Sequence, residues 1–433
     1  MEKSVSLTRN LVRLIRDKEI TQTDLDAAAL FTLDALANAL AGRRSEPGAK
    51  LLNLVAGLNC HGDSGRTALL LGGLTHILEM DDLHRTSVVH PGCVVVPAAY
   101  ALASKTGAGG INFLQAVLHG FEATCRIGMA VGQEHYRIWH STATCGPFGS
   151  AMAAAHLLGL DEDASVDALG NAGTQAAGFW QFLDTGAMSK HLHAGRGAEA
   201  GVIAGELAAL GFSGPPQILE GKRGLFAAAC PDANPAAVLD DPDHRWQLHE
   251  TSIKPWPSCR HTHPAIDAAL KLSGKVDPAT IQSISLGTYQ AALDVCDRPD
   301  PDSVYEAKFS LQHCVAAALI GGHMDFDVFE EQARRDLAPY RQKVLIKADE
   351  PHLSAYPKDW GATLKLTFAD GAEITTQRNH CKGDPEDALS VAEMRDKAMM
   401  LLEFGGVSKP EEFIDNILAM AGGGKLPQLP VFD

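Results

Sequence analysis

Four titratable side chains lie close together in the stretch LEMDDLHRTSVVHPG, residues 78–92. Asp81 and Asp82 precede His84 and His90, and the flanking segments are rich in small apolar residues. Carboxylates and imidazoles in apolar surroundings are typical of acid–base catalysis, because burial tunes the protonation of such groups. We expect Asp82 and His90 to be catalytic and His84 to be structural.

Three further boundaries between a loop and a helix also carry basic or hydroxyl side chains. They fall in the segments YRIWHSTATCGPFGS, GAMSKHLHAGRGAEAG and IKPWPSCRHTHPAIDAA, each preceding a helix of small residues. The side chains of interest there are His140, Thr142, Lys190, Arg196, Cys259 and His263. Free N–H groups at a helix N-terminus favour an anion. We therefore expect the four boundaries to converge on one pocket, whose surplus of Lys, Arg and His predicts a di- or tricarboxylate substrate.

Metal-assisted and nucleophilic mechanisms are the alternatives. The first cluster lacks the HExxH or three-histidine spacing of a zinc site. The segment GPFGSAM lacks the GxSxG turn of a serine nucleophile, and no GxGxxG or GxxxxGK[ST] motif supports nucleotide binding. We therefore predict acid–base catalysis without a metal or cofactor, in which a proton beside a carboxyl group is removed and cations hold the developing anion.

Composition restricts the partners of this chain of 433 residues. Its formal net charge of −16 argues against a nucleic-acid or anionic-membrane surface, because both need basic patches. The nine cysteines form no CxxC pair, which is typical of reduced thiols in a cytoplasmic protein. The N-terminus lacks the apolar core of a signal peptide, and every long apolar run is interrupted by a charge, Gly or Pro. We expect a soluble cytoplasmic protein with no nucleic-acid or membrane partner.

The elements that must position these residues change character once along the chain. Apolar residues recur with helical spacing from about residue 24 to about 212, as in DLDAAALFTLDALANALAG, which ends at Gly42. The abundance of Ala and Gly there predicts helices that pack closely. Apolar and polar residues then alternate in IQSISLGTY, VLIKAD, ATLKLTF and AEITTQR, with an Asp-Gly hairpin turn before the last of them.

The last segment, ALSVAEMRDKAMMLLEFGG with PEEFIDNILAMAGG, is helical again. A chain of this length with 45% hydrophobic residues can bury a large core, and two domains are expected. We predict a mainly α protein: a large all-helical domain at 1–265, a smaller α+β lid domain at 266–388, and C-terminal helices at 389–433 that return to the helical domain.

The blocks EMDDLHRTSVVHPG, WHSTATCGPFGSAMAAAHLLGLD, SKHLHAGRGAEAGVIAGELAALGFSGPPQILEGKRG, KPWPSCRHTHPAIDAAL and AKFSLQHCVAAALI resemble successive signature blocks of the MmgE/PrpD family. That family includes 2-methylcitrate dehydratase, cis-aconitate decarboxylase and iminodisuccinate epimerase. The resemblance implies a cofactor-free, homodimeric enzyme with a helical domain, an α+β lid and a pocket between them. The matched positions that it implies as site residues are Asp82, Thr86, His90, His140, Lys190, Cys259 and His263.

The reaction is less sharply defined than the family, because dehydration, decarboxylation and epimerisation all involve a carbanion-like centre beside a carboxylate. In the vertebrate-type decarboxylase a histidine stands where Cys259 is and a tyrosine where His313 is, and both departures argue against decarboxylation. We expect a dehydratase-type lyase acting on a methylcitrate-like substrate. The alternatives are an epimerase of an imino- or amino-dicarboxylate, a cis-aconitate-type decarboxylase, and a non-catalytic carboxylate-binding protein.

The expected roles follow from charge. We expect His140 or His90 to move the substrate proton, while Asp82 orients an imidazole or binds a substrate hydroxyl. Lys190 would hold a carboxylate, and Arg196 would either assist it or stabilise the start of its own helix. His263, Thr86, Thr142 and Cys259 complete the expected substrate contacts.

Overall fold

The computed structural model describes residues 6–57 and 62–429, so Cys60 lies outside the described residues. The chain divides into two compact units. The first unit comprises Met1–Ile253 together with Ser390–Asp433, and the second comprises Lys254–Leu389. All eight described cysteines are buried and have free thiols.

The boundary at Ile253 precedes the boundary that the sequence predicts at residue 265. The intervening residues bond to the second unit: the Cys259 N–H donates to the Lys308 carbonyl at 2.9 Å, and the Arg260 guanidinium donates to the Asp384 carboxylate at 2.5 and 2.6 Å. These partners are distant in sequence, and for that reason the local pattern did not reveal them.

The first unit is built almost entirely from helices. They are α1 (Leu7–Asp17), α2 (Gln22–Gly42), α3 (Glu46–Gly57), α4 (Ser64–His76), α5 (Gly92–Thr106), α6 (Gly110–Ala130), α7 (Gln133–Ile138), α8 (Ser141–Leu157), α9 (Glu162–Gly173), α10 (Ser189–Ala209), α11 (Leu225–Ala229), α19 (Val391–Phe404) and α20 (Pro410–Ala419). Two short strands, β1 (Leu83–His84) and β2 (Thr251–Ser252), pair antiparallel.

Helix α2 shows how local sequence determines an element. The Thr21 hydroxyl accepts from the Asp24 N–H while the Asp24 carboxylate accepts from the Thr21 N–H, which is a capping box. The helix ends at Gly42, as predicted. By length and composition α2 could also cross a membrane, but 83% of its apolar window is buried, and it packs on α4, α6 and α19. Its hydrophobicity is therefore explained by the core of the first unit.

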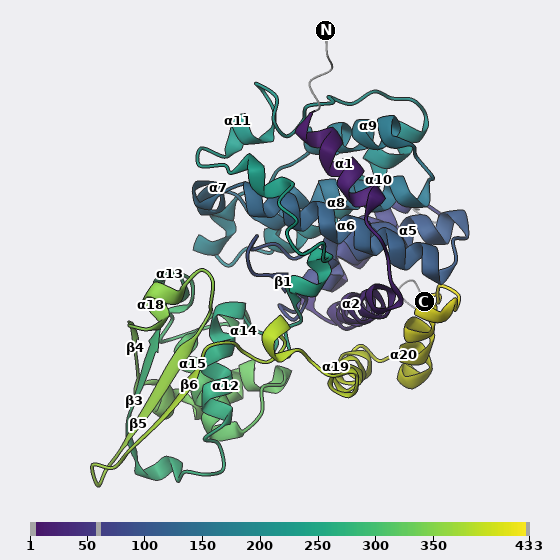
Figure 1. Cartoon of the computed structure of the whole chain (residues 1–433). Helices are drawn as coiled ribbons and strands as arrows, with labels where there is room; N and C mark the ends of the chain where they lie inside the picture. Colours follow the sequence, from purple (N-terminus) through teal and green to yellow (C-terminus); the bar gives the residue numbers. More distant parts are fainter. Residues whose placement is uncertain (1–5, 58–61, 430–433) are drawn as a thin grey trace. The chain divides into compact units, whose positions relative to one another are not determined.

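Helices α4, α5, α6, α8 and α10 pack on one another and approach closely at glycines. Figure 1 shows α6, α8 and α10 in the middle of the first unit. A Cβ atom on Gly201 of α10 would lie 2.2 Å from the Cβ of Ser150 on α8. A Cβ atom on Gly149 of α8 would lie 1.7 Å from the Thr124 Oγ1 on α6. Neither position can accept a side chain without moving a helix. The close packing predicted from Ala and Gly is confirmed.

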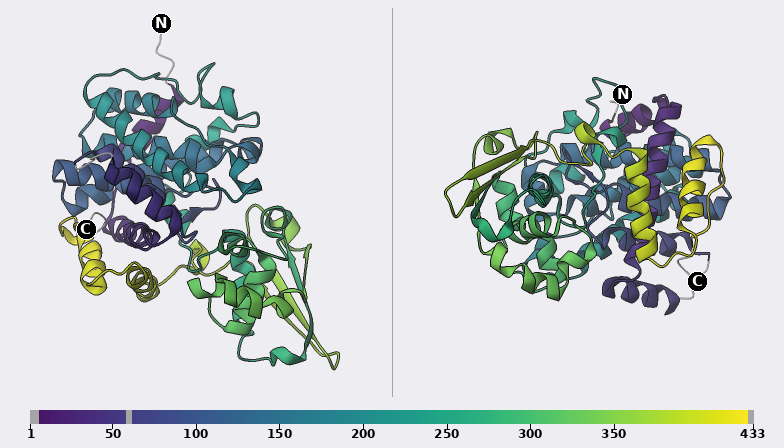
Figure 2. Two further views of the ribbon diagram at one scale, coloured as in Figure 1. Left: turned by 180° about the vertical axis from the view of Figure 1, so that it is seen from behind. Right: turned by 90° about the horizontal axis from the view of Figure 1, so that it is seen from below.

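The C-terminal helices belong to the first unit. Figure 2 shows α19 and α20 alongside α2, with which both are in contact. The Lys397 ammonium of α19 donates to the Asp34 carboxylate of α2 and, at 2.8 Å, to the Met80 carbonyl. All three residues lie in buried positions, so α19 fixes the backbone just before Asp81.

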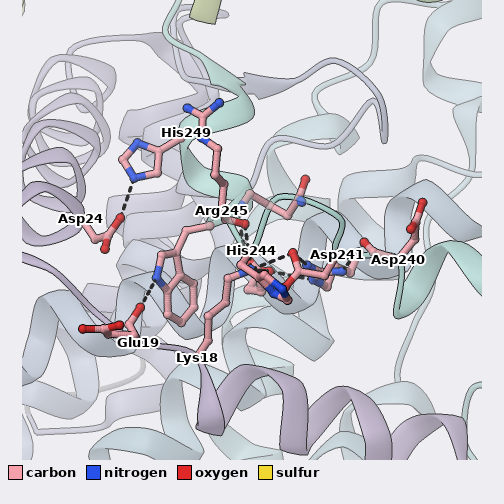
Figure 3. A network of polar contacts seen from close by, with 12 residues as sticks. Lys18, Glu19, Asp24, Asp240, Asp241, His244, Arg245 and His249 are labelled. Carbon is pink, nitrogen blue, oxygen red and sulfur yellow. Dashed lines mark hydrogen bonds and ion pairs between the residues drawn. The ribbon is translucent and has the colours of Figure 1, made fainter.

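A polar network anchors the N-terminal segment to the stretch that leads into β2 (Figure 3). The Lys18 ammonium donates to the Asp241 carboxylate at 3.0 Å and to the Arg245 carbonyl at 2.7 Å. Nearby, His249 Nε2 lies 2.7 Å from the Asp24 carboxylate, and this partner lowers the pKa of Asp24 against the opposing effect of burial. The contacts hold two distant parts of the chain together at the edge of the helical core.

The second unit contains a four-stranded sheet of order β4-β3-β5-β6, which lies along one side of the unit (Figure 1). Strand β3 (Ile281–Thr288) runs parallel to β4 (Val344–Ala348) and antiparallel to β5 (Ala362–Phe368), which pairs antiparallel with β6 (Glu373–Arg378). All four predicted strands are present. Gly371, with a φ of 84°, forms the predicted hairpin turn.

Helices α12 (His263–Leu270) and α15 (Leu311–Gly321) pack against this sheet. The remaining helices of the second unit are α13 (Gln290–Cys296), α14 (Val304–Lys308), α16 (Glu331–Asp336), α17 (Ala338–Arg341) and α18 (His352–Ala355). The described chain is 60% helical with 8% strand. The predicted fold class, mainly α with a large helical part and a smaller α+β part, is confirmed.

Candidate functional site

Three of the four loop–helix boundaries come together in the first unit. Helix α4 ends at His76, and the following loop leads to Gly92 at the start of α5. Helix α8 begins directly after His140, and α10 begins directly before Lys190. Because α10 packs on both α4 and α8, the structure gathers His90, His140 and Lys190 around the ends of these helices.

Five imidazole rings meet at this point, and we call them the histidine cluster. The ring centroid of His76 lies 4.6 Å from that of His90, 5.8 Å from that of His140 and 6.5 Å from that of His191. The ring of His140 lies 5.5 Å from that of His193, and their Nδ1 atoms are 3.3 Å apart. His76 and His140 are both buried, with ring planes only 16° apart. Several groups that can carry a proton therefore lie next to one another.

Burial keeps members of the histidine cluster neutral. It lowers the pKa of His140 well below the ordinary value, and the nearby His76 and Lys190 act in the same direction. Burial also lowers the pKa of His193 to about 4. The Nε2 atom of His140 is buried and has no hydrogen-bond partner among the described residues. A neutral imidazole with an unpartnered nitrogen can take part in proton transfer.

Two aspartates of the loop are held by different partners. The Asp81 carboxylate lies 2.6 Å from His76 Nδ1 and 3.4 Å from His90 Nδ1. Both carboxylate oxygens of Asp82 accept from the Gly92 N–H at 3.0 Å, which caps the start of α5. The sequence predicts that Asp82 orients an imidazole. The group of Asp82 that contacts one is its backbone carbonyl, whose oxygen lies 2.6 Å from His90 Nδ1.

Lys190 forms a buried ion pair with Glu79. Its Nζ atom donates to the two carboxylate oxygens at 2.5 and 2.6 Å, and the side chains are 6% and 2% exposed. Glu79 has a φ of 58°, which is uncommon for a residue other than glycine and marks local backbone strain. Glu79 therefore already balances the positive charge of Lys190, which the sequence predicts to hold a substrate carboxylate.

The other predicted side chains of the first unit have different surroundings. Thr142 is buried, and its Oγ1 accepts from the His90 N–H at 3.0 Å, which ties the loop to α8. Thr86 is exposed in the turn after β1. Arg196 is 52% exposed and pairs with Glu199 on its own helix. This pair lies within α10 and not at its start, where the sequence predicts a stabilising role for Arg196.

The start of α10 differs from the prediction. The sequence places Lys190 and Arg196 before a helix, but both lie inside α10. Gly195 does not interrupt this helix, because it serves a close contact: a Cβ atom there would lie 2.4 Å from the Leu69 carbonyl oxygen of α4. A glycine is therefore required at this position for the close packing of α10 on α4.

The fourth boundary belongs to the second unit. Helix α12 begins at His263, as predicted, and burial lowers the pKa of that residue well below its ordinary value. His263 Nε2 lies 3.3 Å from the Ser258 carbonyl, and its Nδ1 atom has no partner among the described residues. Cys259 is buried just before α12. The substrate contacts assigned to Cys259 and His263 stay predictions.

His84, which we expect to be structural, has both ring nitrogens within hydrogen-bonding distance of a side chain. Its Nδ1 atom lies 2.8 Å from the Ser87 hydroxyl, and its Nε2 atom lies 3.2 Å from the Gln247 side-chain oxygen. Burial lowers its pKa to about 4. These contacts make His84 a suitable control for the histidine cluster.

His76, Asp81 and Cys93 bring donor atoms of metal-binding type within 4.8 Å of one another. However, His76 Nδ1 and Asp81 Oδ2 are only 2.6 Å apart, whereas two ligands of one tetrahedral zinc ion lie about 3.3 Å apart. Burial, together with Asp81 and Asp82, raises the pKa of the Cys93 thiol well above its ordinary value, so the thiol keeps its proton. The 2.6 Å contact fits a hydrogen bond between imidazole and carboxylate and is shorter than the ligand spacing of a tetrahedral zinc site.

Sequence reasoning missed His76 and Glu79 as members of this site. His76 ends an apolar helix, where a single histidine gives no local signal. Glu79 and Lys190 are far apart in the chain, so their pairing is visible only in three dimensions. A usable signal was the spacing of His76 and Asp81 across a helix end, next to further acids in an apolar segment.

Comparisons with known proteins extend over both units. The model of the MmgE/PrpD N-terminal domain matches residues 10–237, and that of the MmgE/PrpD C-terminal domain matches residues 256–419. The chain is 29% identical over 405 residues to the cis-aconitate decarboxylase-like protein oryM of Aspergillus oryzae, covering 84% of this chain and 83% of that protein. It is 27% identical over 348 residues to the cis-aconitate decarboxylase of Mus musculus, covering 76% and 70%. It is 30% identical over 328 residues to a cis-aconitate decarboxylase of Aspergillus terreus, covering 69% and 66%.

Proposed function

Because this chain belongs to the MmgE/PrpD family, we propose that it is an acid–base lyase that dehydrates a small tricarboxylate resembling 2-methylcitrate. The observation that carries this proposal is the histidine cluster, in which the buried Nε2 atoms of His76 and His140 have no partner among the described residues. Dehydration removes one proton from a carbon beside a carboxylate and adds one to the departing hydroxyl. Adjacent imidazoles can accept the first proton and supply the second.

The chemistry of the proposed step is a proton transfer in surroundings of low polarity. An imidazole of the cluster, for which the sequence favours His140 or His90, takes the proton from carbon. The electron pair of the C–H bond enters the adjacent carboxyl group and then expels the hydroxyl, which leaves as water. Lys190, at the start of α10, would place its ammonium near the developing anion once a substrate carboxylate takes the place of Glu79, with which it is paired.

Decarboxylation of a cis-aconitate-like substrate is the second candidate, and the names of the relatives favour it. In that reaction a C–C bond breaks, carbon dioxide leaves, and the resulting carbanion takes a proton from an imidazolium. The same cluster can provide that proton. Cys259 and His313, which replace the histidine and tyrosine of the vertebrate-type enzyme, support dehydration as the first choice.

Proton and carbon NMR in D2O tests the proposal with 2-methylcitrate, citrate and cis-aconitate as substrates. Dehydration gives a new alkene signal with all carboxyl carbons retained, and this is the expected result with 2-methylcitrate. Loss of a labelled carboxyl carbon as bicarbonate identifies the decarboxylase. Deuterium entering a substrate carbon without net conversion, with imino- or amino-dicarboxylates included, identifies an epimerase. Thermal stabilisation by an acid without any change in it identifies a carboxylate-binding protein and refutes the proposal.

A further inference from the structure

The pair of His76 and Asp81 lies at the centre of the histidine cluster. His76 is 0% exposed and Asp81 is 1% exposed, and His76 Nδ1 lies 2.6 Å from Asp81 Oδ2. We infer that His76 is the base that takes the substrate proton and that Asp81 is the residue that positions it. This inference rests on the proposed function and assigns its central proton transfer to one imidazole.

The hydrogen bond to Asp81 fixes which nitrogen of His76 carries the hydrogen. An ionised carboxylate only accepts hydrogen bonds, so the Nδ1 atom of His76 must donate. In the neutral ring the lone pair is then on Nε2. That Nε2 atom is buried and has no hydrogen-bond partner among the described residues. An unpartnered buried acceptor is costly unless something else, such as a substrate, approaches it.

The neighbouring imidazoles are held less favourably for the same task. The Nδ1 atom of His90 lies 2.6 Å from the neutral Asp82 carbonyl and 3.4 Å from the Asp81 carboxylate. The Nδ1 atom of His140 faces that of His193 at 3.3 Å, and an imidazole can either donate or accept. A carboxylate at hydrogen-bonding distance both orients a ring and stabilises the imidazolium that forms when it takes a proton. Among His76, His90 and His140, His76 has the shortest such contact.

The position of His76 allows it to reach the same substrate as the predicted residues. Its ring centroid is 4.6 Å from that of His90 and 5.8 Å from that of His140, to which it is nearly parallel. His76 is therefore next to both rings that the sequence predicts to take part in the reaction. The sequence predicts that His140 or His90 moves the substrate proton, whereas the contact with Asp81 favours His76 as the base.

The proposed step is a proton transfer from a substrate carbon to His76. The C–H bond beside a substrate carboxyl group breaks, its electron pair enters that carboxyl group, and the proton bonds to His76 Nε2. The imidazolium keeps its Nδ1 hydrogen on the Asp81 carboxylate. When the electron pair expels the hydroxyl, the proton leaves His76, directly or through the parallel ring of His140, and departs as part of water. His76 is then neutral again.

Kinetics of three variants test this assignment with the acid that the wild-type protein converts, 2-methylcitrate being the first to use. We expect His76→Gln to lower kcat by about 10²–10⁴-fold with KM changed less than about threefold. Asp81→Asn keeps a hydrogen-bond acceptor but removes the charge, and we expect kcat to fall at least about tenfold with KM retained. His84→Gln is the matched control, another buried histidine of the same segment, and we expect wild-type kcat.

A second measurement separates catalysis from folding and from the proposed function. Histidine labelled with ¹⁵N reports by NMR which ring nitrogen carries hydrogen, and the His76 signals are those missing from His76→Gln. We expect hydrogen on Nδ1 and none on Nε2 in the wild-type protein without substrate, and a changed pattern in Asp81→Asn. If His76→Gln does not fold, the Asp81→Asn protein provides the kinetics, and the His76 signals are assigned as those that change in Asp81→Asn.

The outcomes distinguish the two proposals. Normal kcat in folded His76→Gln, or in Asp81→Asn, overturns the role of His76 while the proposed function stands. Hydrogen found on Nε2 of His76 overturns that role whether or not the enzyme is active. A wild-type protein with the expected His76 spectrum that converts none of the acids refutes the proposed function, and with it the reaction that His76 would serve.

Discussion

Replacing Lys190 by methionine removes the ammonium that faces the Glu79 carboxylate. The two side chains are 6% and 2% exposed, and the nitrogen–oxygen distances are 2.5 and 2.6 Å, so the lost contact is a buried one. Removing one partner of a buried ion pair typically costs about 3–5 kcal/mol, because the other charge stays buried. Since about 1.4 kcal/mol is a tenfold factor, the ratio of folded to unfolded protein should fall by roughly a hundredfold to several thousandfold.

Urea denaturation followed by circular dichroism measures this effect. We expect Lys190→Met to lower the free energy of unfolding by about 3–5 kcal/mol, and the double variant Lys190→Met with Glu79→Gln to recover a large part of it. Lys105→Met is the matched control, because Lys105 pairs with Glu206 at 2.7 Å but is 54% exposed. That control should lose at most about 1 kcal/mol. Equal losses in Lys190→Met and Lys105→Met, or no recovery in the double variant, would refute the reasoning.

Three further predictions concern acid stability, the cap of α5 and metals. Burial lowers the pKa of His84 to about 4 and of His119 to about 3, so below about pH 6.5 the unfolded chain takes up protons that the native protein does not. The free energy of unfolding should therefore fall as the pH drops from 6.5 towards 4, and a urea midpoint independent of pH over that range would contradict this. Asp82→Ala removes the acceptor of the Gly92 N–H and should cost about 0.5–2 kcal/mol, whereas Asp82→Asn should cost less, as measured by the same denaturation. Activity should survive prolonged chelation, and loss of activity that one specific ion restores would show a metal requirement.

Local sequence patterns predicted the elements of this fold well. The capping box of α2 is at Thr21, just before apolar residues begin to recur with helical spacing, and the helix ends at Gly42, where that spacing stops. Strands β3, β4, β5 and β6 coincide with the alternating segments, and the hairpin turns at Gly371. Each of these features depends on residues a few positions apart, and that is the range over which periodicity and turn chemistry act.

The features that the sequence did not predict depend on distant partners. Helix α10 begins at Ser189, earlier than the sequence predicts, and it includes Gly195, which packs closely against the Leu69 carbonyl of α4. The boundary at Ile253 is set by bonds such as that between Arg260 and Asp384. A buried charged group likewise requires a partner, and the identity of that partner depends on which helices become neighbours. Local sequence does not contain that information.

The contacts of the loop between α4 and α5 explain why acids and histidines lie between apolar helices. Glu79 balances Lys190, Asp81 is bound to His76, and the Asp82 carboxylate caps α5. Each acid is buried and each has such a partner, as buried charges require. Protonating any of these carboxylates would disrupt a contact that positions the loop, whereas a neutral imidazole can gain and lose a proton while its ring stays in place. We therefore expect the acids to set position and charge in this site, and the imidazoles to carry the proton.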